Sequence, residues 1–315
     1  MANEATTATP RAGHGAQRPE RGRWRWLPDE RLAQALRRHS LPAVLLRLFT
    51  YVGMLALTVI FVFPLIYMLS TSLKTDQVQF DFPPIIPSVW DWHNYVLGWT
   101  SVGFGHFYFV SVTYAVLSTL GVLFSCSLAA YALARMRFRL RDTVFFIVIA
   151  TLLLPSQVTL IPLYLIYHRL GWLNTLAPLI VPQWFAVNAF SIFLLRQFFL
   201  TLPRDLDDAA RIDGCGEFDI WLRVVLPLSK PALGVVALFQ GVGAWTDFFG
   251  PLIYEQSQAN YPVSVGLDYF QSAFGAMHFN QEMAMTIVSI LPVFVVFFVF
   301  QRYFIRGIVL SGVSR

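Results

Sequence analysis

Residues 206–231, LDDAARIDGCGEFDIWLRVVLPLSKP, form a charged stretch between two long apolar segments. Its charged side chains are Asp207, Asp208, Asp213, Glu217, Asp219, Arg211, Arg223 and Lys230. The 315-residue chain as a whole is only 13% charged and 56% hydrophobic, whereas soluble domains carry about a quarter charged residues. The composition therefore indicates a membrane protein, in which this stretch meets either water or another protein.

Six apolar segments reach the roughly 20 residues that a helix needs to cross a hydrocarbon core. They cover residues 48–73, 107–134, 143–167, 175–195, 231–254 and 283–300. Pro64 and Pro292 lie inside the first and the sixth, and Asp247 interrupts the fifth. We therefore predict an all-α membrane protein with six transmembrane helices.

The basic residues predict the orientation of these six spans. If the N-terminus is cytoplasmic, all of the 23 lysines and arginines except Lys74 and Arg169 lie on the inner side. Such a bias follows the positive-inside rule and places both termini in the cytoplasm. The net charge of +5 is then a sign of topology, and we do not expect nucleic acid as a partner.

The charged stretch has the pattern of two short helices joined by a bend. Pro203 suits the start of the first helix, whose positive end the nearby aspartates favour. Four residues at helical spacing form a face with small side chains at its centre: Leu206, Ala209, Ala210 and Asp213. Gly214 and Gly216 permit the bend. The second helix carries an apolar stripe of Phe218, Trp221, Leu222 and Val225.

Three interpretations of this stretch follow from the residues alone. It is a solvated connector, a docking surface for another protein, or a Mg²⁺ site of a membrane enzyme built on Asp205, Asp207, Asp208 and Asp213. The apolar stripe argues against a connector. Magnesium chemistry of this kind needs a second acidic loop, and Asp142 is the only other acid in a predicted inner loop between spans. The six histidines and two cysteines show no metal-ligand spacing, and we expect no disulfide and no metal.

The same stretch resembles the EAA loop of binding-protein-dependent ABC import permeases. Asp208, Ala209 and Ala210 stand at the Glu-Ala-Ala positions of that motif. Gly214 stands at the position of its glycine, directly after Asp213. Nine residues later Val224, Leu226 and Pro227 stand at its Ile-x-Leu-Pro positions. Asp208 and Val224 replace the usual Glu and Ile, and Cys215 stands where a small residue is usual.

Other segments resemble the sugar-importing, MalG-like branch of that family. They are TSLKTDQVQFDFPPIIPSVWDWHNY, TLLLPSQVTLIPLYLIYHRLGWLNT, AWTDFFGPLIY and the C-terminal QRYFIRGIVLSGVSR. Thr246 departs from the asparagine usual in the third. The resemblance covers everything after the N-terminal tail.

The resemblance implies a MetI-like type I importer permease in the cell membrane. Its expected parts are a cytoplasmic, Arg-rich, largely disordered tail (1–42), a first span with an outer segment (43–105), a five-helix core (106–305) with the EAA coupling loop at 201–231, and a cytoplasmic tail (306–315). The implied partners are a second, non-identical permease, two ATP-binding cassette ATPases that bind the ATP and Mg²⁺, an extracytoplasmic substrate-binding protein and membrane lipid. The chain itself needs no cofactor and is not expected to be an enzyme, since neither lysine stands in a Gly-Lys-Ser/Thr phosphate loop.

The predicted fifth span supplies candidates for the translocation path. Asp247 is an acidic residue inside an apolar segment, and such residues usually face a cavity. We therefore assign Gln240, Trp245 and Asp247 to the path, with helix packing and hydration at the outer surface as the alternatives. The substrate is expected to be a sugar or related carbohydrate, with polyols and glycerol phosphates left open.

Overall fold

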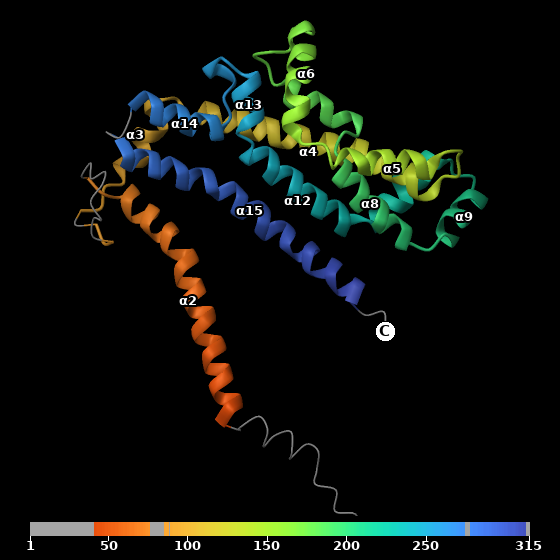
Figure 1. The fold of residues 1–315 in the computed structure, drawn as a ribbon, viewed down its shortest axis with the longest axis horizontal. Coiled ribbons are helices and arrows are strands. Elements are labelled where there is room, and N and C mark those ends of the chain that lie inside the picture. Colours follow the sequence, from red (N-terminus) through yellow and green to blue (C-terminus); the bar gives the residue numbers. More distant parts are fainter. Residues whose placement is uncertain (1–40, 76–84, 88, 275–277, 313–315) are drawn as a thin grey trace, which may run out of the picture. The chain divides into compact units, whose positions relative to one another are not determined.

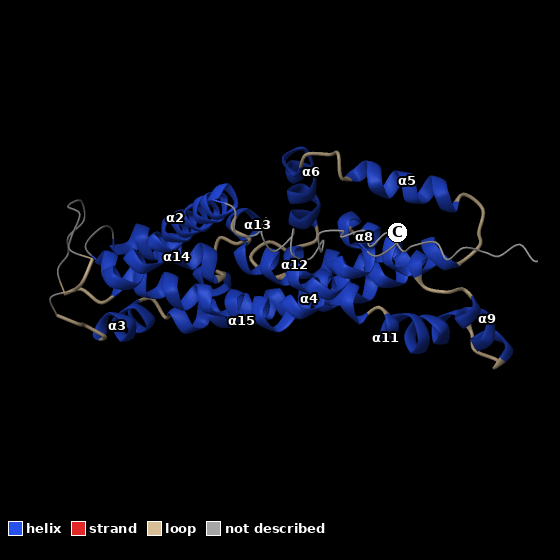
Figure 2. Ribbon diagram, turned by 90° about the horizontal axis from the view of Figure 1, so that it is seen from below, coloured by secondary structure: helices blue, strands red, loops and turns tan. Residues whose placement is uncertain are grey.

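The computed structural model describes residues 41–75, 85–87, 89–274 and 278–312, and every regular element in these ranges is a helix (Figure 2). The all-α prediction is therefore confirmed for this part of the chain. Two compact units are present, Met1–Val62 and Phe63–Arg315. The predicted tail lies outside the described residues up to position 40, and the first helix, α2, begins at Leu41.

The helix α2 (Leu41–Ser72) supplies the described part of the first unit and continues into the second. It has 32 residues, or about 48 Å at 1.5 Å per residue, and is long enough to cross a membrane. Its apolar side chains within the first unit are exposed on all sides, from Leu45 to Ile60. A helix that is apolar all round is typical of a membrane span.

The second unit is built around α4 (Phe104–Arg135). It packs against α8 (Ala189–Thr201) and α12 (Lys230–Thr246), and α12 in turn packs against α15 (Phe279–Gly312) (Figure 1). Small residues along α4 permit close approach. At Gly121, for example, a Cβ would lie 2.7 Å from Trp184, so the indole ring needs the glycine beside it.

Four helical segments are long and apolar enough to cross a membrane: Leu45–Ser72, Phe104–Arg135, Ala177–Thr201 and Phe279–Gln301. The third of these comprises α7 (Ala177–Ile180), η1 (Val181–Phe185) and α8. A fifth is present if the bent pair Glu217–Leu228 and Lys230–Thr246, which meet at 82°, counts as one span. The described residues therefore contain four or five such spans.

The predicted third span, 143–167, is not one helix, and this prediction was wrong. The segment consists of α5 (Arg141–Thr151) and α6 (Ser156–Arg169), which run in different directions in both ribbon views (Figures 1 and 2). Pro155 between them lacks an N–H and disfavours a helical conformation at Leu154. Each helix is shorter than the roughly 20 residues of a single span.

The predicted fifth span, 231–254, is also interrupted. The helix α12 ends at Thr246, Asp247 has an extended backbone, and α13 (Phe249–Tyr254) follows. The sequence placed Asp247 within a helix, whereas it lies in the break between two helices.

Short helices cover the end of the second unit that lies away from the charged stretch. They are α3 (His93–Ser101), η3 (Gln258–Asn260) and α14 (Val263–Phe274). Of these, α14 packs against α4 and α15. The side-chain amides of Asn94 and Asn280 both donate to the carbonyl oxygen of Lys74, which ties the residues after α2 to α3 and α15.

Candidate functional site

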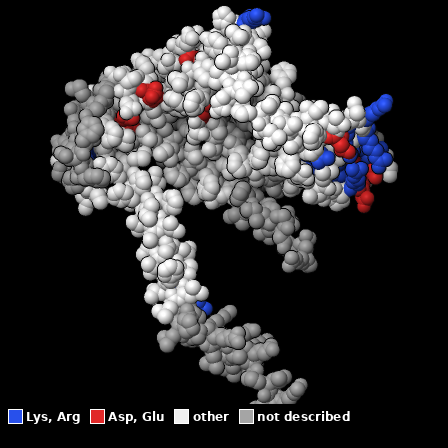
Figure 3. Space-filling model, viewed as in Figure 1, with Lys and Arg blue, Asp and Glu red and all other residues white. Residues whose placement is uncertain are grey.

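The charged stretch folds into a bent pair of helices, called the elbow here and defined as residues 205–228. Its first helix is α9 (Asp205–Ile212), and its second runs continuously through α10 (Glu217–Asp219), η2 (Ile220–Val225) and α11 (Leu226–Leu228). Most of the charged side chains visible in Figure 3 gather at this end of the second unit. The two helices and the bend between them confirm the sequence prediction for this stretch.

The bend depends on one glycine in the left-handed region. Gly214 has φ +85°, its N–H donates to the Arg211 carbonyl, and the next N–H, of Cys215, donates to the Ala210 carbonyl. These two bonds form a Schellman motif, which closes a helix with glycine at this position. The EAA glycine is therefore the residue that ends α9.

The second helix contains a π-helical segment, Ile220–Val225. Its i→i+5 bonding precedes Pro227, which has no N–H to donate to a preceding carbonyl. Trp221 is buried within this segment, and its ring contacts those of Phe124 on α4 and Phe218. The segment therefore anchors the second helix to α4.

Most of the small-residue face expected on α9 is exposed, and only Ala210 of that face is buried in the chain. Asp207 and Ala210 are buried against the rest of the chain, while Leu206 and Ala209 are exposed. Ile212 is 87% exposed at the end of α9. Asp207 is buried because it pairs with an arginine far away in the sequence, which periodicity does not reveal.

The predicted stripe on the second helix is likewise divided. Trp221 and Val225 are buried together with Ile220, whereas Phe218 is 56% exposed and Leu222 is also exposed. Ile212, Phe218 and Leu222 are thus exposed apolar side chains on either side of the bend, and we refer to them as the apolar tip. Among the other motif residues, Asp208, Asp213 and Pro227 are exposed, and Val224 and Leu226 are half-buried against the core.

A buried ion pair attaches α9 to α4. The Nη1 atom of Arg135 lies 3.1 Å from Oδ2 of Asp207, and the two side chains are only 2% and 5% exposed. The Nη2 atom of Arg135 also donates to the Leu202 carbonyl at 2.9 Å. Charges are rarely buried unless they are paired, so this contact fixes the start of the elbow.

A second network attaches the other helix. The Tyr131 hydroxyl donates to Oε2 of Glu217 at 2.7 Å, and Arg211 donates twice to Oε1 of the same carboxylate. Arg211 also pairs with Asp208, at 2.9 Å. The bond with Glu217 raises the pKa of the Arg211 guanidinium further. The network therefore extends from α4 to the motif acid Asp208.

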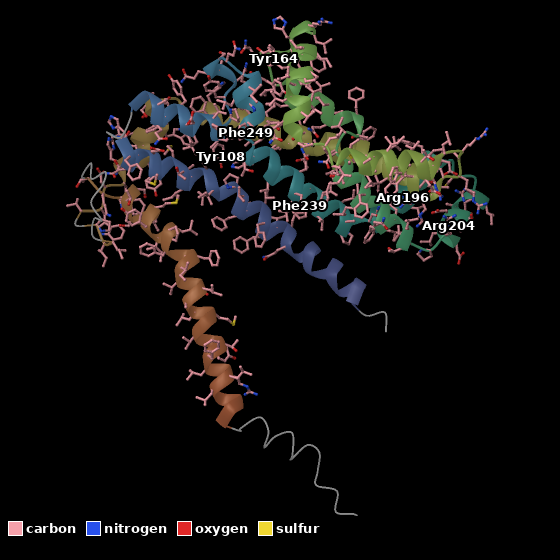
Figure 4. All side chains as sticks on the ribbon, viewed as in Figure 1. Tyr108, Tyr164, Arg196, Arg204, Phe239 and Phe249 are labelled. Atoms are coloured by element: carbon pink, nitrogen blue, oxygen red, sulfur yellow. The ribbon has the colours of Figure 1, made fainter. Side chains whose placement is uncertain are left out.

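Two further arginines lie at this end of the unit, Arg196 on α8 and Arg204 directly before α9 (Figure 4). The guanidinium of Arg196 lies 3.8 Å from the centre of the Phe145 ring, and its Nε donates to the Leu133 carbonyl at 3.2 Å. Arg196 thereby joins α5, α8 and the end of α4.

The three residues assigned to the translocation path do not converge. Gln240 accepts a bond from the Asn188 amide, at 3.1 Å. Trp245 donates to the Ser289 carbonyl on α15, at 2.9 Å. Asp247 accepts from the Tyr114 hydroxyl at 2.9 Å and from the Gly250 N–H at 3.1 Å, so both of its carboxylate oxygens are bonded.

Trp245 does line a cavity of about 310 Å³ between α4, α12 and α15. The other lining residues include Val116, Thr119, Gly241, Pro292 and Val296. The lining is almost wholly apolar, and the one hydroxyl, that of Thr119, has no hydrogen-bond partner among the described residues. Gln240 and Asp247 are not part of it.

At the opposite end of the unit, the loop 255–262 is held by backbone contacts, and we call it the clamped loop. Asn174, with φ +61°, donates from its N–H to Tyr254, accepts from the Gln256 N–H and, through its carbonyl, accepts from the Asn260 amide. His106 on α4 contacts the Ala259 carbonyl, at 2.5 Å. Glu255 in this loop is buried, and burial raises its pKa to about 7 against a smaller opposing effect of Asn260.

Four residues of these attachments were missed by the sequence analysis: Tyr131, Arg135, Asn174 and Glu255. Arg135 was counted only as a basic residue for orientation. The signal in the sequence was its place as the first of four arginines, directly after an apolar span. In the structure the other three arginines are all more exposed. The described residues contain no group of three or more His, Cys, Asp or Glu that could hold a metal ion.

Comparisons with known proteins identify the class. Residues 121–310 match the family described as "Binding-protein-dependent transport system inner membrane component". The chain therefore belongs to this family and is a permease component of a binding-protein-dependent ABC import system. The MetI-like permease fold expected from the sequence is confirmed.

Particular relatives cover nearly the whole chain. The arabinooligosaccharides transport system permease protein AraQ of Bacillus subtilis is 31% identical over 88% of this chain and 99% of its own. The sn-glycerol-3-phosphate transport system permease protein UgpE of Yersinia enterocolitica is 32% identical over 84% of this chain and 96% of its own. The crystal structure of a bacterial ABC transporter involved in the import of the acidic polysaccharide alginate has a chain with TM-score 0.75 and 25% identity, covering 84% of this chain and 99% of that one.

Proposed function

We propose that this chain is one of two non-identical permeases of an ATP-driven importer for a sugar or related carbohydrate. The elbow docks in a cleft of an ATP-binding cassette ATPase, which supplies the ATP and Mg²⁺ chemistry. An extracytoplasmic binding protein delivers the substrate. The observation that carries the proposal is the apolar tip: Ile212, Phe218 and Leu222 are exposed on the one segment that has the EAA spacing.

The elbow suits docking better than it suits a connector. Exposed apolar side chains surrounded by charged ones are typical of protein contacts, where the apolar part supplies affinity and the charges supply orientation. Asp208 is exposed beside Ala209, so it can also accept an arginine of the partner. A bulky substitution at Ala210 would not test docking, because Ala210 is buried and the change would damage the chain's own packing.

The proposed topology has six crossings with both termini in the cytoplasm. The basic residues counted above support it, and α5 with α6 would form the broken third crossing. The proposed translocation path runs beside α12, where Trp245 lines the cavity. Gln240 and Asp247 contribute to this path by holding α12 against Asn188 and Tyr114.

The proposed substrate class follows from the relatives. AraQ is named for arabinooligosaccharides, and the alginate importer for an acidic polysaccharide. UgpE is named for sn-glycerol-3-phosphate, so a glycerol phosphate is the second candidate. Thermal unfolding of the cognate binding protein with oligosaccharides and with glycerol phosphate separates the two, since a ligand raises the Tm of the protein that binds it.

Docking is tested by Ile212→Glu in the complex co-expressed with its cognate subunits. A charge placed in the centre of an apolar contact should reduce co-purification of the ATPase about tenfold or more. Leu170→Glu is the matched control, since Leu170 is also an exposed aliphatic side chain but lies directly after α6, away from the elbow. Full retention of the ATPase by Ile212→Glu would contradict docking through the elbow.

A further inference from the structure

The elbow is attached to α4 by two side chains that are one helical turn apart. Tyr131 and Arg135 are at i and i+4, so they lie on the same face of α4. Tyr131 holds the second helix of the elbow through Glu217, and Arg135 holds the first through Asp207. Each of the two helices therefore has its own polar attachment to a single helix of the membrane part.

Both attachments are shielded from water on the α4 side. Tyr131 is 2% exposed and Arg135 is 5% exposed. Removing one partner of a buried ion pair leaves the other charge buried and unpaired, which is strongly destabilising. The bonds of Arg135 also include the Leu202 carbonyl, which lies in the connection from α8 to α9. The elbow and the end of α4 are thus held together as one body.

The other end of α4 is joined to the helices around the clamped loop. The Tyr114 hydroxyl donates to Asp247, in the break between α12 and α13. The Ser111 hydroxyl accepts from the Val263 N–H at the start of α14, at 2.7 Å. From Ser111 to Arg135 the helix is unbroken, so a displacement at one end is carried to the other.

We propose that Tyr131 and Arg135 are positioning residues that transmit movement of the elbow into α4, and through α4 to Asp247 and α14. This proposal rests on docking of the ATPase at the elbow. It assigns separate tasks to two sets of residues. The apolar tip binds the ATPase, and the Tyr131 and Arg135 attachments convert the movement of the bound ATPase into movement of the membrane helices.

Tyr131→Phe is the sharpest test, because it removes one hydroxyl and keeps the ring in the core. The measurement is substrate transported per ATP hydrolysed by the complete complex in proteoliposomes, together with stimulation of ATP hydrolysis by the loaded binding protein. We expect transport per ATP to fall about fivefold or more, as for loss of a coupling free energy between sites, while the ATPase still co-purifies. A purely structural role of Tyr131 would lower thermal stability without changing this ratio.

Tyr95→Phe is the matched control, since the Tyr95 hydroxyl bonds to Ser72 and lies on α3. It should leave transport per ATP unchanged. An unchanged ratio in Tyr131→Phe would overturn the proposal, and so would loss of the ATPase, which would make Tyr131 part of docking. The exchange pair Arg135→Asp with Asp207→Arg adds a second measurement, in which coupling is expected to recover relative to either single variant. Failure of the ATPase to co-purify with the wild-type permease would instead overturn the proposed function.

Discussion

The elbow and the clamped loop are held by opposite means, although both join helices of the second unit. The elbow is fixed by charged side chains that reach a single helix, α4, and it exposes apolar residues. The clamped loop is fixed largely through backbone groups, by Asn174 and His106, and it exposes Gln256, Ser257 and Gln258. The elbow is thus suited to an apolar protein contact, while the polar clamped loop is suited to water or a polar partner.

The largest effect is expected from breaking the elbow's buried pair. Arg135→Ala leaves the Asp207 carboxylate buried without its cation, which should destabilise the second unit by about 3–5 kcal/mol. Thermal unfolding of the purified permease measures this. Arg223→Ala removes an arginine from an exposed pair with Asp219, with side chains 73% and 43% exposed, and should cost less than about 1 kcal/mol. Equal losses in the two variants would show that burial does not distinguish these pairs.

In the clamped loop, the expected effect is a dependence on pH. Burial raises the pKa of Glu255 from 4.5 to about 7, so the folded protein holds this proton more tightly than the unfolded chain does. The stabilisation is complete below about pH 4.5 and is lost as the pH rises through 7, with an upper limit of about 3 kcal/mol.

Glu255→Gln tests this, because the amide has the same shape and does not titrate. The difference in Tm between the variant and the wild type should therefore increase from pH 5 to pH 8. A difference that stays constant over this range would show that Glu255 is not protonated in the folded protein. The elbow offers the contrast in Glu217, since the hydrogen bond from Tyr131 and the bonds from Arg211 lower the pKa of this carboxylate, away from this range.

Local features of the elbow were predictable from the sequence, and its attachments were not. Gly214 and helical spacing gave the two helices and the bend, because these depend on residues close together in the chain. The burial of Asp207 depends on Arg135, 72 residues earlier, and nothing local distinguishes Asp207 from its exposed neighbour Asp208. Long-range pairing therefore decided which face of α9 is displayed.

The membrane helices show the same division. Hydropathy identified the apolar segments, because it depends on which residues are present. It carries no information on where the backbone changes direction. It joined α5 to α6 across Pro155 and α12 to α13 across Asp247, where the backbone turns. Proline was a signal for the first break. The second depends on bonds from Asp247 to Tyr114 and Gly250, of which the first is long-range.

The smallest expected effect separates two glycines of the elbow that differ only in backbone conformation. A Cβ at either Gly214 or Gly216 would meet no atom within 4 Å, so neither substitution is limited by space. Gly214 has φ +85° and Gly216 has φ −76°. Gly214→Ala should therefore cost about 1–2 kcal/mol of left-handed strain and weaken coupling by shifting the tip relative to α4. Gly216→Ala should be close to neutral in thermal unfolding and in transport per ATP. Equal effects of the two substitutions would show that the bend does not depend on the Schellman motif. The position of the apolar tip would then be set by the Tyr131 and Arg135 attachments alone.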